Sequence, residues 1–180
     1  CIDGDNHGKG SDGSDIDIPK LVEKIEHYRL PLVATRSKSG GAHLYLFGEE
    51  YLPAKLVIRL LNSWRDMLQI PNHVDIFPKQ DSLTTSSGEK SLGNWINLPF
   101  FDKDKTVRYA IDDKGQKMSF ELFISYAQSR RVTVAALQEM AHREHLEAPP
   151  CIQKMIHTGV ESGSRNDSMY NVVVYLKRAR

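Results

Sequence analysis

The sequence predicts an α+β protein, in which short strands and flanking helices occupy the first module and a small all-helical segment follows. Short β-prone runs, over 31–36 and 42–47, alternate with longer stretches whose apolar residues recur at helical spacing. From Ser119 onward only the helical pattern remains. The expected domains are therefore a catalytic-type module over residues 1–118 and a helical segment over 119–180.

Short strands and helices are expected to alternate along the first module. Pro19, just after Asp17, marks a helix start, and the adjacent Gly40 and Gly41 permit the tight turn of a hairpin. Pro53 opens the widest amphipathic stretch of the chain. In chain order we expect a strand near Ile2, a loop over 6–15, a helix to about Leu30, a hairpin with strands over 31–36 and 42–47, a helix over 53–70, a strand over 73–77, and turns and short β-prone runs to residue 118.

Length and composition restrict the class of protein. The 180 residues are 26% charged with a formal net charge of +1, which excludes a uniformly basic nucleic-acid coat but permits a local basic groove. With two cysteines and no apolar run near the ~18 residues of a membrane span, we expect a cytoplasmic protein, or one of the host cytoplasm if it is viral, with no membrane partner. Because the chain starts without Met on a β-prone run, we also expect an N-terminal piece to be missing.

Two carboxylates stand one residue apart at the start of the chain, Asp3 and Asp5. On a strand, residues i and i+2 share a face, and two carboxylates this close repel each other unless a cation lies between them. A calcium loop of the EF-hand type is excluded, because His7 and Ser14 occupy positions five and twelve, where that loop needs Asp or Asn and Glu. The pair alone is a weak signal for a metal site.

A third carboxylate, Asp75, interrupts an otherwise apolar strand. A charge in that setting is rarely tolerated without a partner. Three carboxylates on neighbouring strands can hold two Mg²⁺ or Mn²⁺ ions, which in nucleotidyl transfer activate the attacking 3′-hydroxyl and stabilise the leaving pyrophosphate. The pattern therefore predicts a metal site in which Asp3, Asp5 and Asp75 are the catalytic ligands.

The stretch RSKSGGAHLYLF, residues 36–47, predicts a phosphate cradle. Its small residues let backbone amides approach an anion, and its basic side chains supply positive or donor groups. Taken alone, the stretch is better explained as an ordinary Gly-Gly hairpin with surface charges and a structural histidine. The predicted nucleotide-binding residues are Arg36, Lys38, Ser39 and His43, together with Lys79, which follows the acidic strand.

A single-stranded template would also need a basic path and surfaces on which bases can stack. The candidates are Trp95, Phe100, Phe101, Lys103, Lys105 and Arg108. Burial in the core explains Trp95 and Phe100 at least as well as template binding does.

Taken in order, these motifs resemble the archaeo-eukaryotic primase superfamily, and most closely its primase-polymerase branch from phage, plasmid and conflict-system proteins. The resemblance covers residues 1–101, and the tail over 148–176 is similar to the helical segment that follows such domains. The motifs that carry it are the D-x-D of Asp3 and Asp5, SGGAHLYLF with its histidine, the strand of Asp75 running into FPKQ, and GNWINLPFF.

The resemblance implies an RRM-like catalytic sheet and assigns roles to residues. Asp3, Asp5 and Asp75 would bind the metal, and His43 would contact the phosphates of the incoming nucleotide, with Ser39 as a helper because Gly41 stands where the family often has Ser. In the tail, Arg165 and Asn166 would contact the template or the initiating nucleotide. The implied partners are single-stranded DNA, NTP or dNTP, and a helicase in the same chain or replicon.

The interpretation that unites these observations is DNA-templated nucleotidyl transfer, as primer synthesis, DNA polymerisation or both. A metal-dependent nuclease or phosphatase would use similar carboxylates but has less need of a triphosphate cradle. A non-catalytic single-stranded nucleic-acid-binding module is the other alternative, although its carboxylates would repel phosphate. A relaxase is excluded, since the chain has no His-hydrophobic-His pair.

Overall fold

The structure is a computed structural model that describes residues 1–4, 16–82, 93–146, 152, 155 and 165–178. The chain divides into two compact units, Cys1–Val134 and Ala135–Arg180, and each is described here by itself. None of the helices within the described ranges combines the length and the hydrophobicity that crossing a bilayer requires.

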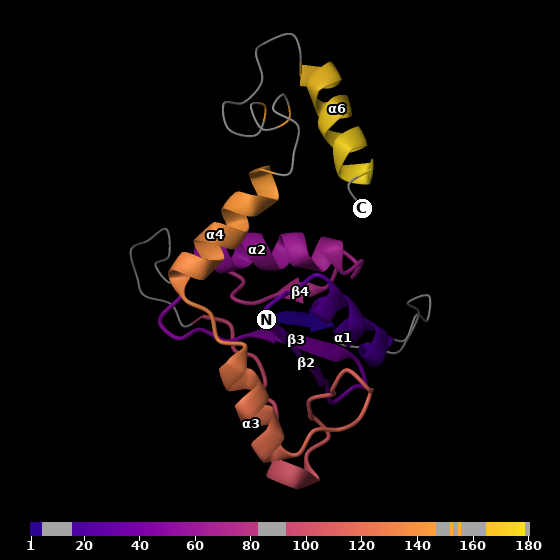
Figure 1. The fold of residues 1–180 in the computed structure, drawn as a ribbon, viewed down its shortest axis with the longest axis vertical. Coiled ribbons are helices and arrows are strands. Elements are labelled where there is room, and N and C mark those ends of the chain that lie inside the picture. The colour runs from indigo at the N-terminus through magenta and orange to yellow at the C-terminus, as the bar shows by residue number, and fades with distance from the viewer. Residues whose placement is uncertain (5–15, 83–92, 147–151, 153–154, 156–164, 179–180) are drawn as a thin grey trace. The chain divides into compact units, whose positions relative to one another are not determined.

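A four-stranded antiparallel sheet forms the centre of the first unit (Figure 1). Its strands are β1 (Ile2–Gly4), β2 (Leu32–Arg36), β3 (Ala42–Leu46) and β4 (Asp75–Ile76), in the spatial order β2-β3-β1-β4. The predicted α+β class is confirmed, and the short strand β1 lies between two partners.

Two helices pack on the sheet, α1 (Ile18–His27) beside β2 and α2 (Ala54–Met67) beside β4 (Figure 1). The Asp17 side chain caps α1 by accepting from the Lys20 amide, 3.1 Å away. Both helices end about three residues earlier than the apolar spacing predicts, because Arg29 and Gln69 adopt positive φ angles of 53° and 61°. The amides at these positions bond back to carbonyls of the last turn, which closes each helix.

The register of the sheet separates an apolar row from a polar one. Cα partners place Ala34, Leu44, Ile2 and Ile76 in one row across the four strands. The adjacent row is Thr35, His43, Asp3 and Asp75, which we call the polar row. Because successive side chains on a strand point to opposite faces, the polar row lies on the face opposite the apolar row.

A second core covers part of the polar-row face. Val33, two residues before Thr35 on the same face, is buried against Phe123 and Ala127 of α3 (Phe120–Ser129) and against Phe100, Ala110 and Met118. This packing joins α3 to the first unit, so the structural division falls after Val134, whereas the sequence analysis placed its boundary after residue 118. The functional division into a catalytic module and a helical primase segment stays a prediction.

The remaining elements are helical, and those after Ser119 agree with the helical pattern of that part of the sequence. A short 3₁₀ helix, η1 (Lys103–Lys105), lies in the first unit. Helix α4 (Val134–Leu146) begins at the unit boundary, and α6 (Arg165–Arg178) lies in the second unit. Helix α6 lies within the helical segment that the sequence predicts over residues 119–180.

Helices α1 and α3 are joined by a polar cluster. Glu26 Oε1 accepts a hydrogen bond from the Tyr126 hydroxyl, 2.8 Å away, and contacts the guanidinium of Arg130. Arg130 also donates to the Leu30 carbonyl at 3.1 Å and lies over the Tyr126 ring. The cluster therefore links α3, which carries part of the second core, to α1.

This cluster predicts a stability loss at alkaline pH. Burial, followed by the hydrogen bond to Glu26, raises the pKa of Tyr126 from 10.0 to about 12. Because the folded-state pKa is the higher one, the contribution of the phenol is complete below about pH 10 and is lost as the pH rises towards 12. Tyr126→Phe should lower the free energy of unfolding at pH 7 by about 0.5–1.5 kcal/mol and show a smaller further loss between pH 10 and 12.

Urea unfolding of both proteins at a series of pH values measures this difference. Tyr51→Phe, at a fully exposed tyrosine, is the control and should follow the wild type. Parallel pH profiles for wild type and Tyr126→Phe would contradict the role of the cluster.

Candidate active site

The polar row brings two of the three predicted carboxylates together. Asp3 on β1 is the Cα partner of His43 on β3 and of Asp75 on β4. Register partners in an antiparallel pair have Cα atoms about 4.5–5.5 Å apart and side chains on the same face. Asp3, His43 and Asp75 therefore form a continuous set across three neighbouring strands. Asp5, the third predicted carboxylate, lies outside the described residues.

His43 is buried and held at both ring nitrogens. Its Nε2 lies 2.7 Å from Asp3 Oδ1, and its Nδ1 lies 3.1 Å from the Tyr45 hydroxyl oxygen. The Tyr45 hydroxyl donates to the Asn97 carbonyl in a short hydrogen bond. A carbonyl has no proton to give, so the phenol proton goes to Asn97 and the phenol oxygen accepts from His43 Nδ1. The Nδ1 atom therefore carries a proton, and Nε2 faces the carboxylate.

Asp3 keeps an unsatisfied acceptor. Its side chain is 18% exposed, and Oδ1 is buried without an aligned hydrogen bond from any residue that the structure describes. His43 Nε2 lies close to that oxygen but is not aligned with it as a hydrogen-bond donor. A buried carboxylate oxygen without a donor is costly. A cation at this oxygen would remove the cost.

Asp75 has a cationic partner that is easily displaced. Lys79 Nζ lies 2.7 Å from Asp75 Oδ2, and both side chains are about half exposed. Exposed pairs of this kind contribute only ~0–1 kcal/mol. Asp75 could therefore exchange Lys79 for a cation at little cost, and the ammonium group of Lys79 would remain near the site.

The described residues fit a magnesium or manganese ion of the type that substrate phosphates complete. They contain no group of three or more His, Cys, Asp or Glu side chains placed to hold a metal by themselves. Mg²⁺ commonly takes only one or two carboxylates and fills its shell with water and phosphate oxygens. Asp3 and Asp75, with the unsatisfied Oδ1 of Asp3, meet that requirement.

The predicted cradle forms a tight turn next to the polar row. The Ser37 amide bonds to the Gly41 carbonyl at 2.8 Å, and Gly40 adopts a φ of 94°, which favours glycine. The Ser37 and Ser39 hydroxyls are 3.0 Å apart. The turn leads into β3 at Ala42, the Cα partner of Gly4, so it lies at the end of the sheet that follows Asp3.

The other predicted nucleotide-binding residues have different surroundings. Arg36 Nη1 donates to the carbonyls of Ser37 and Val107, at 3.1 and 3.3 Å, and so supports the turn, whereas Lys38 is exposed. Arg165 and Asn166 begin α6 in the second unit, and their side chains are not among those described. The nucleotide and template roles of all these residues stay predictions.

Sequence reasoning missed two residues that build the site. Tyr45 orients His43, and a signal for it exists, because it stands two residues after His43 and so shares its strand face. Thr35 ends the polar row and donates to the His43 carbonyl at 3.4 Å. The expected hairpin pairs the two strands, but only the observed register shows that Thr35 lies opposite His43.

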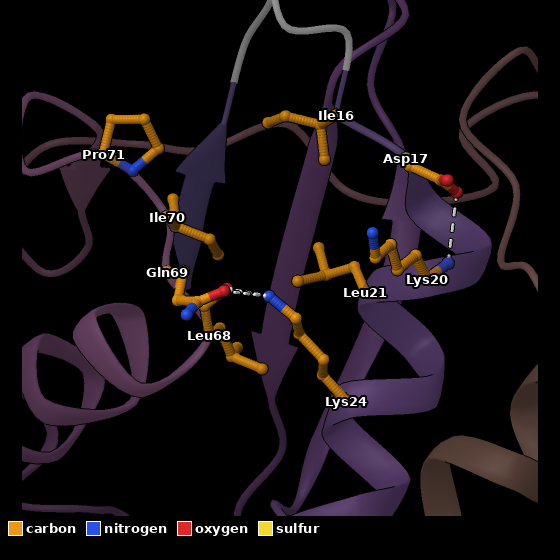
Figure 2. Close-up of a pocket in the computed structure, with 9 residues that line it drawn as sticks. All are labelled: Ile16, Asp17, Lys20, Leu21, Lys24, Leu68, Gln69, Ile70 and Pro71. Atoms are coloured by element: carbon orange, nitrogen blue, oxygen red, sulfur yellow. Dashed lines mark hydrogen bonds between the residues drawn. The ribbon is translucent and has the colours of Figure 1, made fainter. Parts of the chain in front are cut away.

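A cavity of about 230 Å³ lies between α1 and the segment that follows α2 (Figure 2). Figure 2 shows Lys24 donating across it to Gln69, at 2.8 Å. Ile16 lines this cavity, and a Cβ built on Gly4 would come within 2.8 Å of its side chain. Gly4 shares a strand face with Ile2 of the apolar row, so the cavity lies on the side of the sheet away from the polar row.

The family described as "TOTE conflict system, Archaeo-Eukaryotic Primase domain" matches residues 1–142, a span that includes the whole sheet and the polar row. The chain belongs to this family. No curated protein matches it. The resemblance to the archaeo-eukaryotic primase superfamily is thus confirmed, and membership supports a primase-type nucleotidyltransferase with nucleic acid and nucleotide substrates.

The hydrogen bonds of His43 predict a fixed ring proton. In ¹⁵N spectra of the histidine rings, Nδ1 of His43 should be protonated at neutral pH, because Tyr45 can only accept there. Tyr45→Phe removes the acceptor and should speed exchange of that proton or shift it to Nε2. The spectrum of His43→Gln assigns the signal among the seven histidines. An unprotonated Nδ1 in the wild type would contradict the assignment.

Proposed function

We propose that this domain catalyses DNA-templated nucleotidyl transfer, as primer synthesis, DNA polymerisation or both. The observation that carries the proposal is the polar row, in which a buried carboxylate with an unsatisfied oxygen stands between a histidine and a second carboxylate. Membership of a primase family supports the same class of reaction. The proposed substrates are a single-stranded DNA template and NTP or dNTP, and a helicase is the proposed partner.

In the proposed mechanism the carboxylates hold the cation and the cradle holds the nucleotide. Asp3 and Asp75, with Asp5, would hold Mg²⁺ or Mn²⁺, which when bound supplies charge neutralisation for the triphosphate and lowers the pKa of the attacking hydroxyl. The chain itself contributes position and electrostatics. No covalent nucleophile is required.

His43 would bind a phosphate oxygen rather than transfer a proton. Its Nδ1 proton is committed to Tyr45, and its Nε2 shares the side of the row that the triphosphate would approach. Because Nδ1 already carries a proton, Nε2 would donate to a phosphate oxygen only from a doubly protonated ring, in place of its present contact with Asp3 Oδ1. The Ser37 and Ser39 hydroxyls, Lys38 and Lys79 would bind the remaining oxygens, while Arg36 holds the Ser37–Gly41 turn in shape.

Isosteric substitution of the carboxylates tests the metal site. Asp3→Asn and Asp75→Asn should each lower primer extension on single-stranded DNA by roughly 10²–10³-fold, because each removes charge stabilisation from the reacting phosphate. The matched control is Asp113→Asn, at an exposed turn residue outside the polar row. Assays with each nucleotide type and with Mg²⁺ or Mn²⁺ also determine the substrate preference.

A second readout does not depend on activity. Mn²⁺ should raise the unfolding temperature of the wild type and of Asp113→Asn, since ligand binding to the folded state stabilises it. The shift should disappear in Asp3→Asn. Full extension activity in Asp3→Asn or Asp75→Asn would refute the proposed site. Degradation of labelled DNA without nucleotides would favour the nuclease alternative.

The helical tail carries a separate prediction about initiation. The resemblance assigns Arg165 and Asn166, at the start of α6, to the template or the initiating nucleotide. Arg165→Ala should therefore impair de novo primer synthesis several-fold more than extension of an annealed primer. Arg178→Ala, at the other end of the same helix, is the control. Equal loss of both activities in a folded Arg165→Ala protein would count against an initiation role.

A further inference from the structure

Large aromatic side chains are exposed on the short segment that begins at residue 95. Trp95 is 80% exposed and Phe101 is 82% exposed, with Leu98 exposed between them. Phe100, next to Phe101, is only 4% exposed and stacks on Phe123 in the second core. The template candidates of the sequence therefore divide cleanly: Phe100 belongs to the core, and Trp95 and Phe101 face outward.

The backbone of this segment is anchored at several points. The Asn97 carbonyl accepts from Tyr45, which also contacts His43 of the polar row. The Phe100 amide bonds to the Arg108 carbonyl at 2.9 Å, and Phe100 adopts a φ of 54°, uncommon for a non-glycine residue. The exposed rings thus project from a fixed backbone, and Asn97 places that backbone beside the proposed active site.

Arg108 adds an unpaired donor to the same segment. Its side chain is half-buried, and its Nε atom is buried without a hydrogen-bond partner among the described residues. A buried guanidinium nitrogen without an acceptor is costly. Its neighbour Val107 accepts from Arg36, so Arg108 stands next to the base of the Ser37–Gly41 turn. A phosphate oxygen of a ligand is the acceptor that this position lacks.

We propose that residues 95–108 form the surface that binds the single-stranded nucleic acid, with Trp95 and Phe101 stacking on bases and Arg108 contacting a phosphate. This inference rests on the proposed function. Rigid exposed aromatics beside a basic donor are the features that bind single strands without sequence preference. The segment has only one more basic than acidic residue. Stacking therefore supplies most of the affinity, and binding depends only weakly on salt.

Binding without catalysis tests the surface. Fluorescence anisotropy of dye-labelled oligo(dT) is measured with the full chain in EDTA and without nucleotide, so that no reaction contributes. Trp95→Ala and Phe101→Ala should each weaken binding by roughly 5- to 150-fold, the range that loss of one stacking partner produces. Trp95→Phe should restore most of the affinity. Tyr51→Ala, at a fully exposed aromatic residue of another segment, is the matched control and should bind normally.

The salt dependence tests Arg108 separately. Arg108→Gln should weaken binding and reduce the slope of log affinity against log salt by about 0.7, the value for one phosphate contact on a single strand. Arg108→Lys should keep the slope. Unchanged affinity in folded Trp95→Ala and Phe101→Ala, or a steep salt slope that these variants leave intact, would overturn the proposal.

The same measurement separates this inference from the proposed function. Asp3→Asn should still bind oligo(dT), because the strand surface does not include the metal site. If the wild type binds oligo(dT) but shows no nucleotidyl transfer, and Trp95→Ala weakens that binding, the surface stands and the catalytic assignment fails. If transfer occurs and both aromatic variants bind oligo(dT) normally, the catalytic assignment stands and the surface is wrong.

Discussion

The site depends on the register of one three-residue strand. β1 pairs with β3 on one side and β4 on the other, and its central residue, Asp3, meets His43 and Asp75. A slip of one residue would move Asp3 to the face of the apolar row and place Ile2 or Gly4 among the polar groups. Ile2 opposes such a slip, because it is buried between its register partners Leu44 and Ile76 and would lose that burial. Packing on one face thus fixes the chemistry on the other.

The proposed metal site would join two carboxylates that lie in different surroundings. Asp3 is mostly buried beside His43 with an oxygen unsatisfied, so a cation there would offset the cost of its burial. Asp75 is exposed and paired with Lys79, so exchanging that partner for a cation would cost little. A cation would be attracted chiefly by Asp3 and positioned by Asp75. The charge of Lys79 would then be free for phosphate.

The sequence predicts elements well and the partners of side chains poorly. Asp75 could be singled out from the sequence because it interrupts an apolar strand. The hairpin turn could be predicted from its adjacent glycines, and Gly40 does adopt a positive φ. The pairing of Asp3 with both His43 and Asp75 could not be predicted, since strand order is a tertiary property. The sequence cannot tell which of the neighbouring Phe100 and Phe101 is buried, because that depends on the backbone turn at Phe100. Asp5, Arg165 and Asn166 stay predictions.

A ladder of aromatic rings joins the site to the second core. Tyr45 stacks on Phe47 at a centroid distance of 6.0 Å, Phe47 contacts Phe123 edge-on, and Phe123 stacks on Phe100 at 4.7 Å. The residue that orients His43 and the residue that orients the exposed Phe101 therefore belong to one packed unit. Close-packed interiors resist independent movement of their members. His43 and the proposed strand surface are thereby held in a fixed relation, as the proposed templated reaction would require of its nucleotide and its template.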